Sequence, residues 1–420
     1  MHIILAGLVF FGILTLWVPD YWAVAVFQVG VCTLCAMVMW RSLNHLPRLT
    51  YPLLAFGAAV ITGLMQWLIG STAYLFVTQC AVVQWATFLG IFLIGTCLFG
   101  DERISRWFRL AMVWFSFFVA VAAMLQTFSS EGKVFWVFPS GYHDCVMGPF
   151  LSCNHYAAFI EAILPVALCQ ALISEKDSLL YSGMAAVMYA SVVASASRAG
   201  TVLASGEVLA VIVLLWIRGH VTGRATGLFI FRITVLVAVF IGVVGWASTW
   251  HRFRVPDPMA VRMELAMGSL RMITEHPLSG VGLGAWSTVY PHYAIIDIGA
   301  FANQAHNDWL QWIAEGGIPF GLVMAGLFYW CVCAALRTVW GLGTLAVFLH
   351  AFVDYPFSRP ALGAWTIVIL AMLASSLPRG ASLASQLQLR GLGGRAGGRS
   401  DAVDETERAD ARLLLGFGSR

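Results

Sequence analysis

The sequence predicts an all-α, polytopic membrane protein with about twelve transmembrane helices and a folded loop on the outer side of the bilayer. Of the 420 residues, 60% are hydrophobic and only 11% are charged, whereas soluble domains carry about 25% charged residues. The apolar residues also gather in long runs, and about 20 such residues suffice to cross the hydrocarbon of a bilayer. Most of the chain is therefore expected to lie in a membrane.

Twelve apolar runs account for the predicted helices. They cover residues 3–18, 22–40, 52–70, 74–99, 108–128, 151–173, 179–196, 200–217, 228–249, 317–336, 340–353 and 361–377. The first run starts at the initiator methionine without a basic segment and is followed at once by the second, which favours a retained helix over a cleaved signal peptide. The eleventh run is short and polar at its end.

Lysine and arginine in the short loops predict a cytoplasmic N-terminus, because basic residues are retained on that side. This orientation places the loops with Arg41, Arg48, Arg103, Arg106, Arg109, Lys176, Arg218, Arg224, Arg232 and Arg337 inside. Arg198, Arg359 and a cluster of Arg252, Arg254, Arg262 and Arg271 then lie outside, against the bias. We interpret them as candidates for binding an anionic group; the alternative is that long loops are translocated regardless of charge.

The chain divides into a membrane domain and a tail. We expect residues 1–380 to form the membrane domain, which includes a folded outer loop at 251–316 that mixes a helical pattern with glycine turns and aromatic residues. Residues 381–420 are rich in glycine and arginine and then in charge, which predicts a disordered cytoplasmic tail. The net charge of +3 without a basic patch argues against nucleic acid as a partner. The cysteines follow no zinc spacing, and neither a metal nor a cofactor is expected.

A histidine lies at the start of a predicted short helix near the end of the outer loop. Asn307 suits the N-cap, Asp308 adds a first-turn acid, and Gly316 and Gly317 are typical of a helix end. His306 would therefore face the outside solvent, where a neutral imidazole can take a proton from a hydroxyl. The alternative is a histidine that only caps the helix.

A glycine-rich stretch, Gly280-Val-Gly-Leu-Gly284, precedes that histidine. No strand pattern comes before it and no glycine-lysine-serine pattern follows it, so a nucleotide site is not expected. The glycines permit a tight turn whose amides either pack closely or face a phosphate.

Further polar residues converge on the same predicted face. Arg198 lies in a tight turn between two apolar runs, where an arginine marks a functional site or extends to the lipid headgroups. Asn154 and His155 begin another run. His350, Asp354 and Arg359 lie together near the end of the membrane domain.

Four of these stretches resemble, in order, motifs of the O-antigen ligase and polymerase superfamily. They are Gly148-Pro-Phe-Leu-Ser-Cys-Asn154-His-Tyr, Ser195-Ala-Ser-Arg198-Ala-Gly, Arg262 through His276-Pro-Leu-Ser-Gly-Val-Gly-Leu-Gly284, and His306-Asn-Asp-Trp-Leu310 with Glu315-Gly-Gly317. The resemblance covers about residues 148–377. The first motif departs from the family pattern, which usually has a second asparagine where Ser152 or Cys153 stands.

The resemblance implies a metal-independent, inverting glycosyltransferase of the bacterial inner membrane. Such an enzyme moves a glycan from undecaprenyl diphosphate to an acceptor hydroxyl at the periplasmic face, so that the outer loop would be periplasmic. It implies that His306 is the general base, and that Arg198 and Arg262 bind the diphosphate. Supporting roles would fall to Asn154, His155, Asn307, Glu315 and Asp354.

Two questions stay open at this point. The acceptor could be a lipid A core, a growing glycan or a protein hydroxyl. A transporter or flippase for a lipid-linked polysaccharide would also need many helices; it should show broken helices and ionisable residues deep in the membrane. Glu161 and Glu207 are the main charged residues within the apolar runs.

Overall fold

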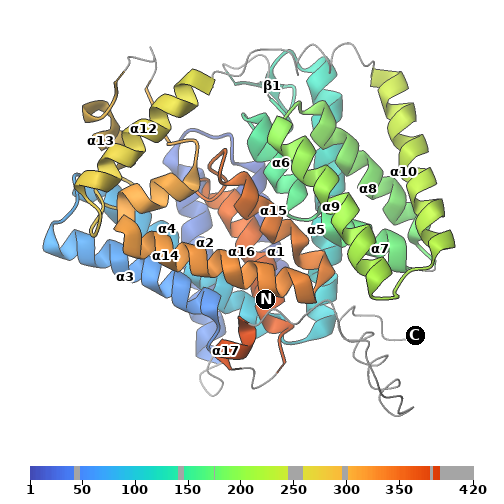
Figure 1. The fold of residues 1–420 in the computed structure, drawn as a ribbon, viewed down its shortest axis with the longest axis horizontal. Coiled ribbons are helices and arrows are strands. Elements are labelled where there is room, and N and C mark those ends of the chain that lie inside the picture. The colour runs from blue at the N-terminus through green and yellow to red at the C-terminus, as the bar shows by residue number, and fades with distance from the viewer. Residues whose placement is uncertain are drawn as a thin grey trace.

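The computed structural model describes residues 1–41, 48–140, 146–174, 176–244, 259–295, 301–378 and 382–387, and over this range the chain is mainly helical (Figure 1). The helices are α1 (His2–Leu14), α2 (Tyr21–Arg41), α3 (Tyr51–Ile69), α4 (Leu75–Leu98), α5 (Glu102–Ser129), α6 (Cys153–Glu161), α7 (Leu164–Ile173), α8 (Ser178–Ala194), α9 (Arg198–Ile217), α10 (Gly223–Val244), α12 (Met259–Glu275), α13 (Trp286–Val289), α14 (Asp308–Arg337), α15 (Leu342–His350), α16 (Pro360–Ser375) and α17 (Leu383–Gln386). Two 3-10 turns, η1 (Tyr290–His292) and η2 (Val339–Gly341), and an antiparallel hairpin of β1 (Lys133–Val134) with β2 (Phe138–Pro139) complete the described elements.

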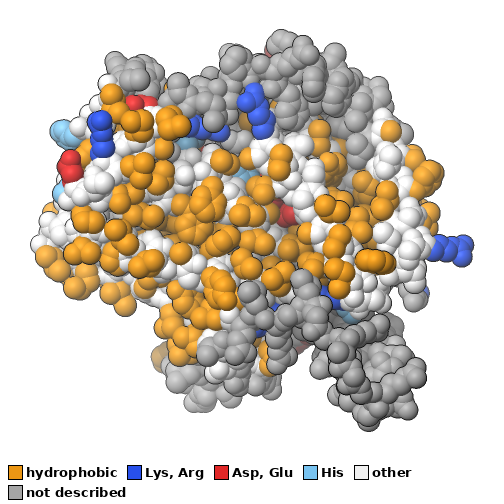
Figure 2. All heavy atoms as spheres, in the orientation of Figure 1, with side chains coloured by type: hydrophobic (Ala, Val, Ile, Leu, Met, Phe, Trp, Pro, Cys, Tyr) orange, Lys and Arg blue, Asp and Glu red, His pale blue; other side chains and the backbone are white. Residues whose placement is uncertain are grey.

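Every predicted apolar run overlaps a helix, and seven spans in the described residues are long and apolar enough to cross a membrane. These are α2, α3, α4, most of α5, α6 together with α7, α9 and α14. The remaining runs fall on shorter apolar helices, so a helical membrane protein is confirmed, while the number of twelve spans stays a prediction. Figure 2 shows hydrophobic side chains spread across the middle of one face, as lipid contact requires.

One helix starts earlier than its apolar run predicts. α5 begins at Glu102 rather than near residue 108, because the Asp101 side chain accepts a hydrogen bond from the Arg103 amide at 2.8 Å. The three arginines expected in a loop therefore lie on the first turns of this helix. Arg109 is buried there and forms an ion pair of 2.6 Å with Glu102.

The centre of the bundle is formed by α6, α7, α15 and α16, whose side chains are almost all buried. In Figure 1, α3, α4 and α14 flank this centre on one side, and α8, α9 and α10 lie on the other. The run predicted at 151–173 is broken between α6 and α7, just before Pro165, which cannot donate the backbone hydrogen bond of a continuous helix.

The described part of the predicted outer loop, residues 259–295 and 301–316, is folded. α12 and α13 lie together at the top of Figure 1 and share a small core of their own, which includes Leu265, Met272, Trp286 and Tyr290. Its side of the membrane stays a prediction, and Arg252 and Arg254 lie outside the described residues.

The segment predicted to be a disordered tail begins with an ordered piece. α17 packs against the end of α14, where the Arg337 guanidinium donates to the Ser385 carbonyl at 2.6 Å. The backbone of residues 388–420 lies outside the described part of the chain.

A buried pair joins the last residue of α6 to the last residue of α15. His350 Nδ1 lies 3.0 Å from Glu161 Oε2, and both side chains are 0% exposed. The carbonyl of His350 also accepts the Asp354 amide at 3.0 Å. The pair therefore fixes where the segment after α15 leaves the bundle.

Removing one member of this pair should destabilise the protein. Glu161→Ala would leave His350 buried without its acceptor, and we expect the free energy of unfolding to fall by about 3–5 kcal/mol. Glu161→Gln keeps an oxygen in the same place and should lose much less. Thermal unfolding of the detergent-solubilised protein measures both. A loss in Glu161→Ala no larger than the small loss expected for Glu161→Gln would show that the pair contributes little.

Candidate active site

Asp354 lies between two histidines that are distant from it in the sequence. Its Oδ2 is 3.5 Å from Nε2 of His155, and its Oδ1 is 3.6 Å from Nδ1 of His306. Both separations are longer than a normal hydrogen bond, and these two nitrogens and Oδ2 are buried without a hydrogen-bond partner among the described residues. Native proteins rarely leave such atoms unpaired, so a cluster of them indicates a functional site.

The ring of Tyr355 contacts both histidines. Its centroid lies 4.7 Å from that of His155 and 4.8 Å from that of His306, each in an edge-to-face arrangement. Arg359 also lies over the Tyr355 ring, with its guanidinium carbon 5.3 Å from the centroid of that ring. Tyr355 thus links an arginine to the two histidines.

His306 is held in a backbone conformation that side chains other than glycine seldom adopt. Its φ is +50°, which costs of order 1–3 kcal/mol when a residue lies in the left-handed region. The neighbours on both sides are fixed. The Ala305 amide donates to Gln311 Oε1 at 3.1 Å, and Asn307 caps α14 through the Leu310 amide at 3.0 Å. The imidazole is 40% exposed, so this constraint presents it to solvent.

The prediction for the helix after His306 is confirmed at both ends. Asn307 is the N-cap, and the first part of α14 ends at Gly317, where φ is +77° and ψ is 174° before the chain resumes a helix. Asp308 does more than provide a first-turn charge. Its buried carboxylate accepts the Phe357 amide at 2.8 Å and the Ser358 hydroxyl at 2.7 Å.

The glycine-rich turn packs closely, and its amides are occupied. Val281 and Gly282 donate to the carbonyls of Ala314 and Glu315 at 2.9 and 3.0 Å, and Gly284 donates to Glu315 Oε2 at 2.9 Å. A side chain at Gly280 would collide with the backbone of Glu315. Of the two predicted alternatives, close packing is therefore correct and a phosphate cradle is wrong. Glu315 belongs to this turn rather than to the histidine cluster.

The residue before Arg198 contacts Asn154 near the start of α6. The Ser197 hydroxyl, which caps α9, donates to Asn154 Oδ1 at 2.8 Å. Asn154 precedes His155, so the exposed Arg198 begins a helix beside the histidine cluster. The other predicted arginine, Arg262, lies on α12.

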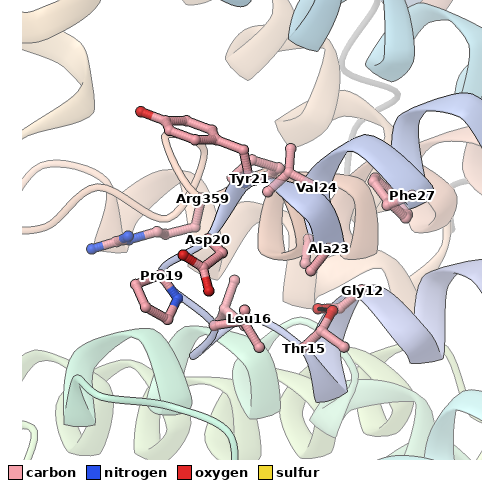
Figure 3. Close-up of a pocket in the computed structure, with 13 residues that line it drawn as sticks. Gly12, Thr15, Leu16, Pro19, Asp20, Tyr21, Ala23, Val24, Phe27 and Arg359 are labelled. Atoms are coloured by element: carbon pink, nitrogen blue, oxygen red, sulfur yellow. Dashed lines mark hydrogen bonds between the residues drawn. The ribbon is translucent and has the colours of Figure 1, made fainter.

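A pocket of about 200 Å³ adjoins Arg359 (Figure 3). It lies between the turn after α1, the start of α2 and the start of α16, and apolar side chains such as Leu16, Val24 and Phe27 form much of its lining. In Figure 3, Asp20 and Arg359 lie on the same side of it.

Sequence reasoning did not assign roles to Tyr355, Gln311 or Gln66. The Gln66 side chain accepts the Leu283 amide at 2.9 Å and donates to the carbonyls of Ser279 and Glu315 at 2.7 and 2.8 Å. The sequence did contain a signal for the role of Gln66: it is a polar residue within the apolar run of α3, and a polar side chain at that depth needs hydrogen-bond partners.

The charge of Asp354 is favoured by its neighbours. Burial on its own would raise the pKa of Asp354, but attraction to His155 and the approach of His306 and His350 lower that pKa from 3.8 to about 2. Since the folded-state pKa is depressed, the resulting stability is complete above pH 3.8 and is lost as the pH falls toward 2.

The negative charge of Asp354 predicts that the stability difference between the wild type and an uncharged variant depends on pH. Asp354→Asn should lower the free energy of unfolding by about 2 kcal/mol near pH 4 relative to the wild type. The difference should shrink as the pH is lowered from 4 toward 2, because the wild type then also loses the charge. Unfolding in detergent across this range tests it. A difference that does not change with pH would contradict the proposed origin of the shift.

Part of the chain is similar to one family of known proteins. The family model described as O-antigen ligase matches residues 183–326, a segment that contains Arg198, Arg262, His306, Asn307 and Glu315. Neither the curated proteins nor the solved structures include a match. This match confirms, over residues 183–326, the resemblance to the O-antigen ligase and polymerase superfamily.

Proposed function

We propose that this protein moves a glycan from undecaprenyl diphosphate to an acceptor hydroxyl at the periplasmic face of the bacterial inner membrane. The observation that carries the proposal is the half-exposed imidazole of His306 beside the buried carboxylate of Asp354, at 3.6 Å. The family match supports the same class of enzyme.

In this proposal His306 is the general base. Asp354 keeps the proton of His306 on Nδ1, so that Nε2 is left to accept a proton. The acceptor hydroxyl gives its proton to Nε2 while its oxygen bonds to the anomeric carbon of the glycan. The bond from that carbon to the carrier breaks, and the diphosphate leaves with the electron pair. Attack opposite the leaving group inverts the anomeric centre.

The gap between His306 and Asp354 is compatible with this role. Catalytic hydrogen bonds are often long before substrate binds and shorten in the complex. His155, on the other side of the carboxylate, would hold Asp354 in place.

Positive charge would stabilise the departing diphosphate. Arg198 and Arg262 are our candidates, since the first begins α9 next to Ser197, which bonds Asn154, and the second lies on α12 of the folded loop. Arg359 is a third, because it stacks on the tyrosine that contacts His306. The apolar pocket beside Arg359 suits the isoprenoid portion of the carrier.

A transporter or flippase is the second candidate, and one observation favours it. The break between α6 and α7, together with buried Glu161 and Glu207, resembles the discontinuous helices of transporters. However, Glu161 is already paired with His350, which leaves Glu207 as an isolated buried carboxylate whose two oxygens have no partner among the described residues. By contrast, the unpartnered atoms of His155, His306 and Asp354 lie together, and His306 is 40% exposed. We therefore favour the transferase.

Replacing the proposed base should abolish transfer without unfolding the protein. His306→Ala is expected to lower the transfer rate by about 10²–10⁴-fold, measured in proteoliposomes that contain the lipid-linked donor and an acceptor. His292→Ala is the matched control, because that exposed histidine lies in the same folded loop but outside the cluster. Transfer by His306→Ala at the wild-type rate would remove His306 from this role.

A deletion strain should separate the possible acceptors. We expect lipid-linked glycan to accumulate on the periplasmic side, since the carrier would be delivered but not consumed. Full-length chains that are not attached to lipopolysaccharide indicate a ligase, and single unpolymerised repeats indicate a polymerase. Accumulation on the cytoplasmic side would instead favour the flippase.

A further inference from the structure

We propose that a second, polar pocket next to the histidine motif binds one sugar ring of the glycan, an inference that rests on the proposed function. This sugar pocket measures about 120 Å³. It lies between α4, α13, the first turns of α14 and the segments just before His306 and just after Tyr355. Its neutral polar lining consists of Gln84, Ser287, Asn303, Gln304, Gln311 and Ser358.

The lining fits a sugar better than it fits a phosphate or a lipid. Six amide or hydroxyl side chains offer both donors and acceptors, while Trp85 and Trp312 provide apolar surface. The described residues around the pocket include neither lysine nor arginine, so a diphosphate would find no counter-charge there. The carboxylate of Glu315 is already occupied by the Gly284 amide and by Gln311 Nε2 at 3.0 Å.

Several of these polar groups have hydrogen-bonding capacity to spare. Within the described chain, the side chains of Asn303 and Ser287 make no hydrogen bond, and Gln84 makes only a long one of 3.4 Å to the Phe357 carbonyl. By contrast, Gln311 is committed to Gln304, Glu315 and the Ala305 amide. The pocket thus contains one glutamine held in place by the protein, Gln311, and other polar side chains that are available to form hydrogen bonds with a ligand.

The pocket lies close to the proposed base. Gln304 is two residues before His306, so their Cα atoms lie within about 7 Å of each other. The Ser358 hydroxyl bonds the carboxylate of Asp308, two residues after His306. A sugar held in the pocket would therefore place the adjacent sugar of the same glycan near the imidazole.

The sugar could belong to the donor glycan or to the acceptor, and steady-state kinetics separate the two. The full-length protein is reconstituted in proteoliposomes, and the KM for donor and for acceptor is measured separately. The variant combines Gln84→Ala with Asn303→Ala. Loss of these neutral hydrogen bonds should raise the KM for one of the substrates about tenfold, with kcat nearly unchanged because His306 is intact.

Gln79→Ala is the matched control, since Gln79 is an exposed residue of the same helix outside the pocket. It should leave both KM values unchanged. A raised KM for donor in the double variant assigns the sugar to the donor, and a raised KM for acceptor assigns it to the acceptor. Unchanged values for both would overturn the sugar pocket.

A direct binding measurement keeps this inference separate from the proposed function. Phosphate-free glycan, released from the lipid-linked donor, is titrated into the detergent-solubilised wild type and double variant. We expect affinity to drop about tenfold in the variant. Weaker binding in the variant but no transfer by the wild type would reject the transferase and retain the pocket. Wild-type transfer with equal binding by both proteins would reject the pocket alone.

Discussion

The candidate site depends on the buried carboxylate of Asp308. This side chain binds the segment that follows Tyr355, and the Asp308 amide donates to the carbonyls of Ala351 and Asp354 at 2.9 and 3.2 Å. Through these hydrogen bonds, the first residue of α14 joins the loop segment that contains His306 to the loop segment that contains Asp354. A buried carboxylate is tolerated only while it is hydrogen-bonded, so the two segments cannot separate without a large cost. That constraint also maintains the strained backbone of His306.

The parts of this arrangement that are local in sequence were predictable. Long apolar runs give helices because the lipid leaves no other way to satisfy the backbone. Asn307 as a cap and Gly317 as an interruption follow from side-chain and backbone preferences within a few residues. The convergence of His306, His155 and Asp354 on one end was predicted from topology, because His155 and Asp354 lie where apolar runs begin or end and His306 lies in the outer loop on the same side.

The pairings across the bundle were not predictable. Nothing in the neighbourhood of Glu161 indicates that it meets His350, 189 positions away, or that the carboxylate of Asp308 holds residues 357 and 358. Such contacts depend on which helices lie side by side, and a single sequence carries no record of that. The glycine turn was ambiguous for the same reason, since its amides are occupied by α14 and by Gln66.

The segment from Tyr355 to Pro360 separates two pockets of opposite character. Phe357 and Ser358 line the polar one, whereas Arg359 and Pro360 line the apolar one beside α1 and α2. A lipid-linked glycan consists of an isoprenoid, a diphosphate and sugars, in that order. The apolar pocket, Arg359 and the polar pocket follow one another in the same order along this part of the protein. On the proposed function, the isoprenoid would meet apolar walls, the diphosphate would meet Arg359, and the sugars would extend toward Gln304 and Asn303. The anomeric carbon between diphosphate and sugar would then lie near Tyr355, the residue whose ring contacts His306.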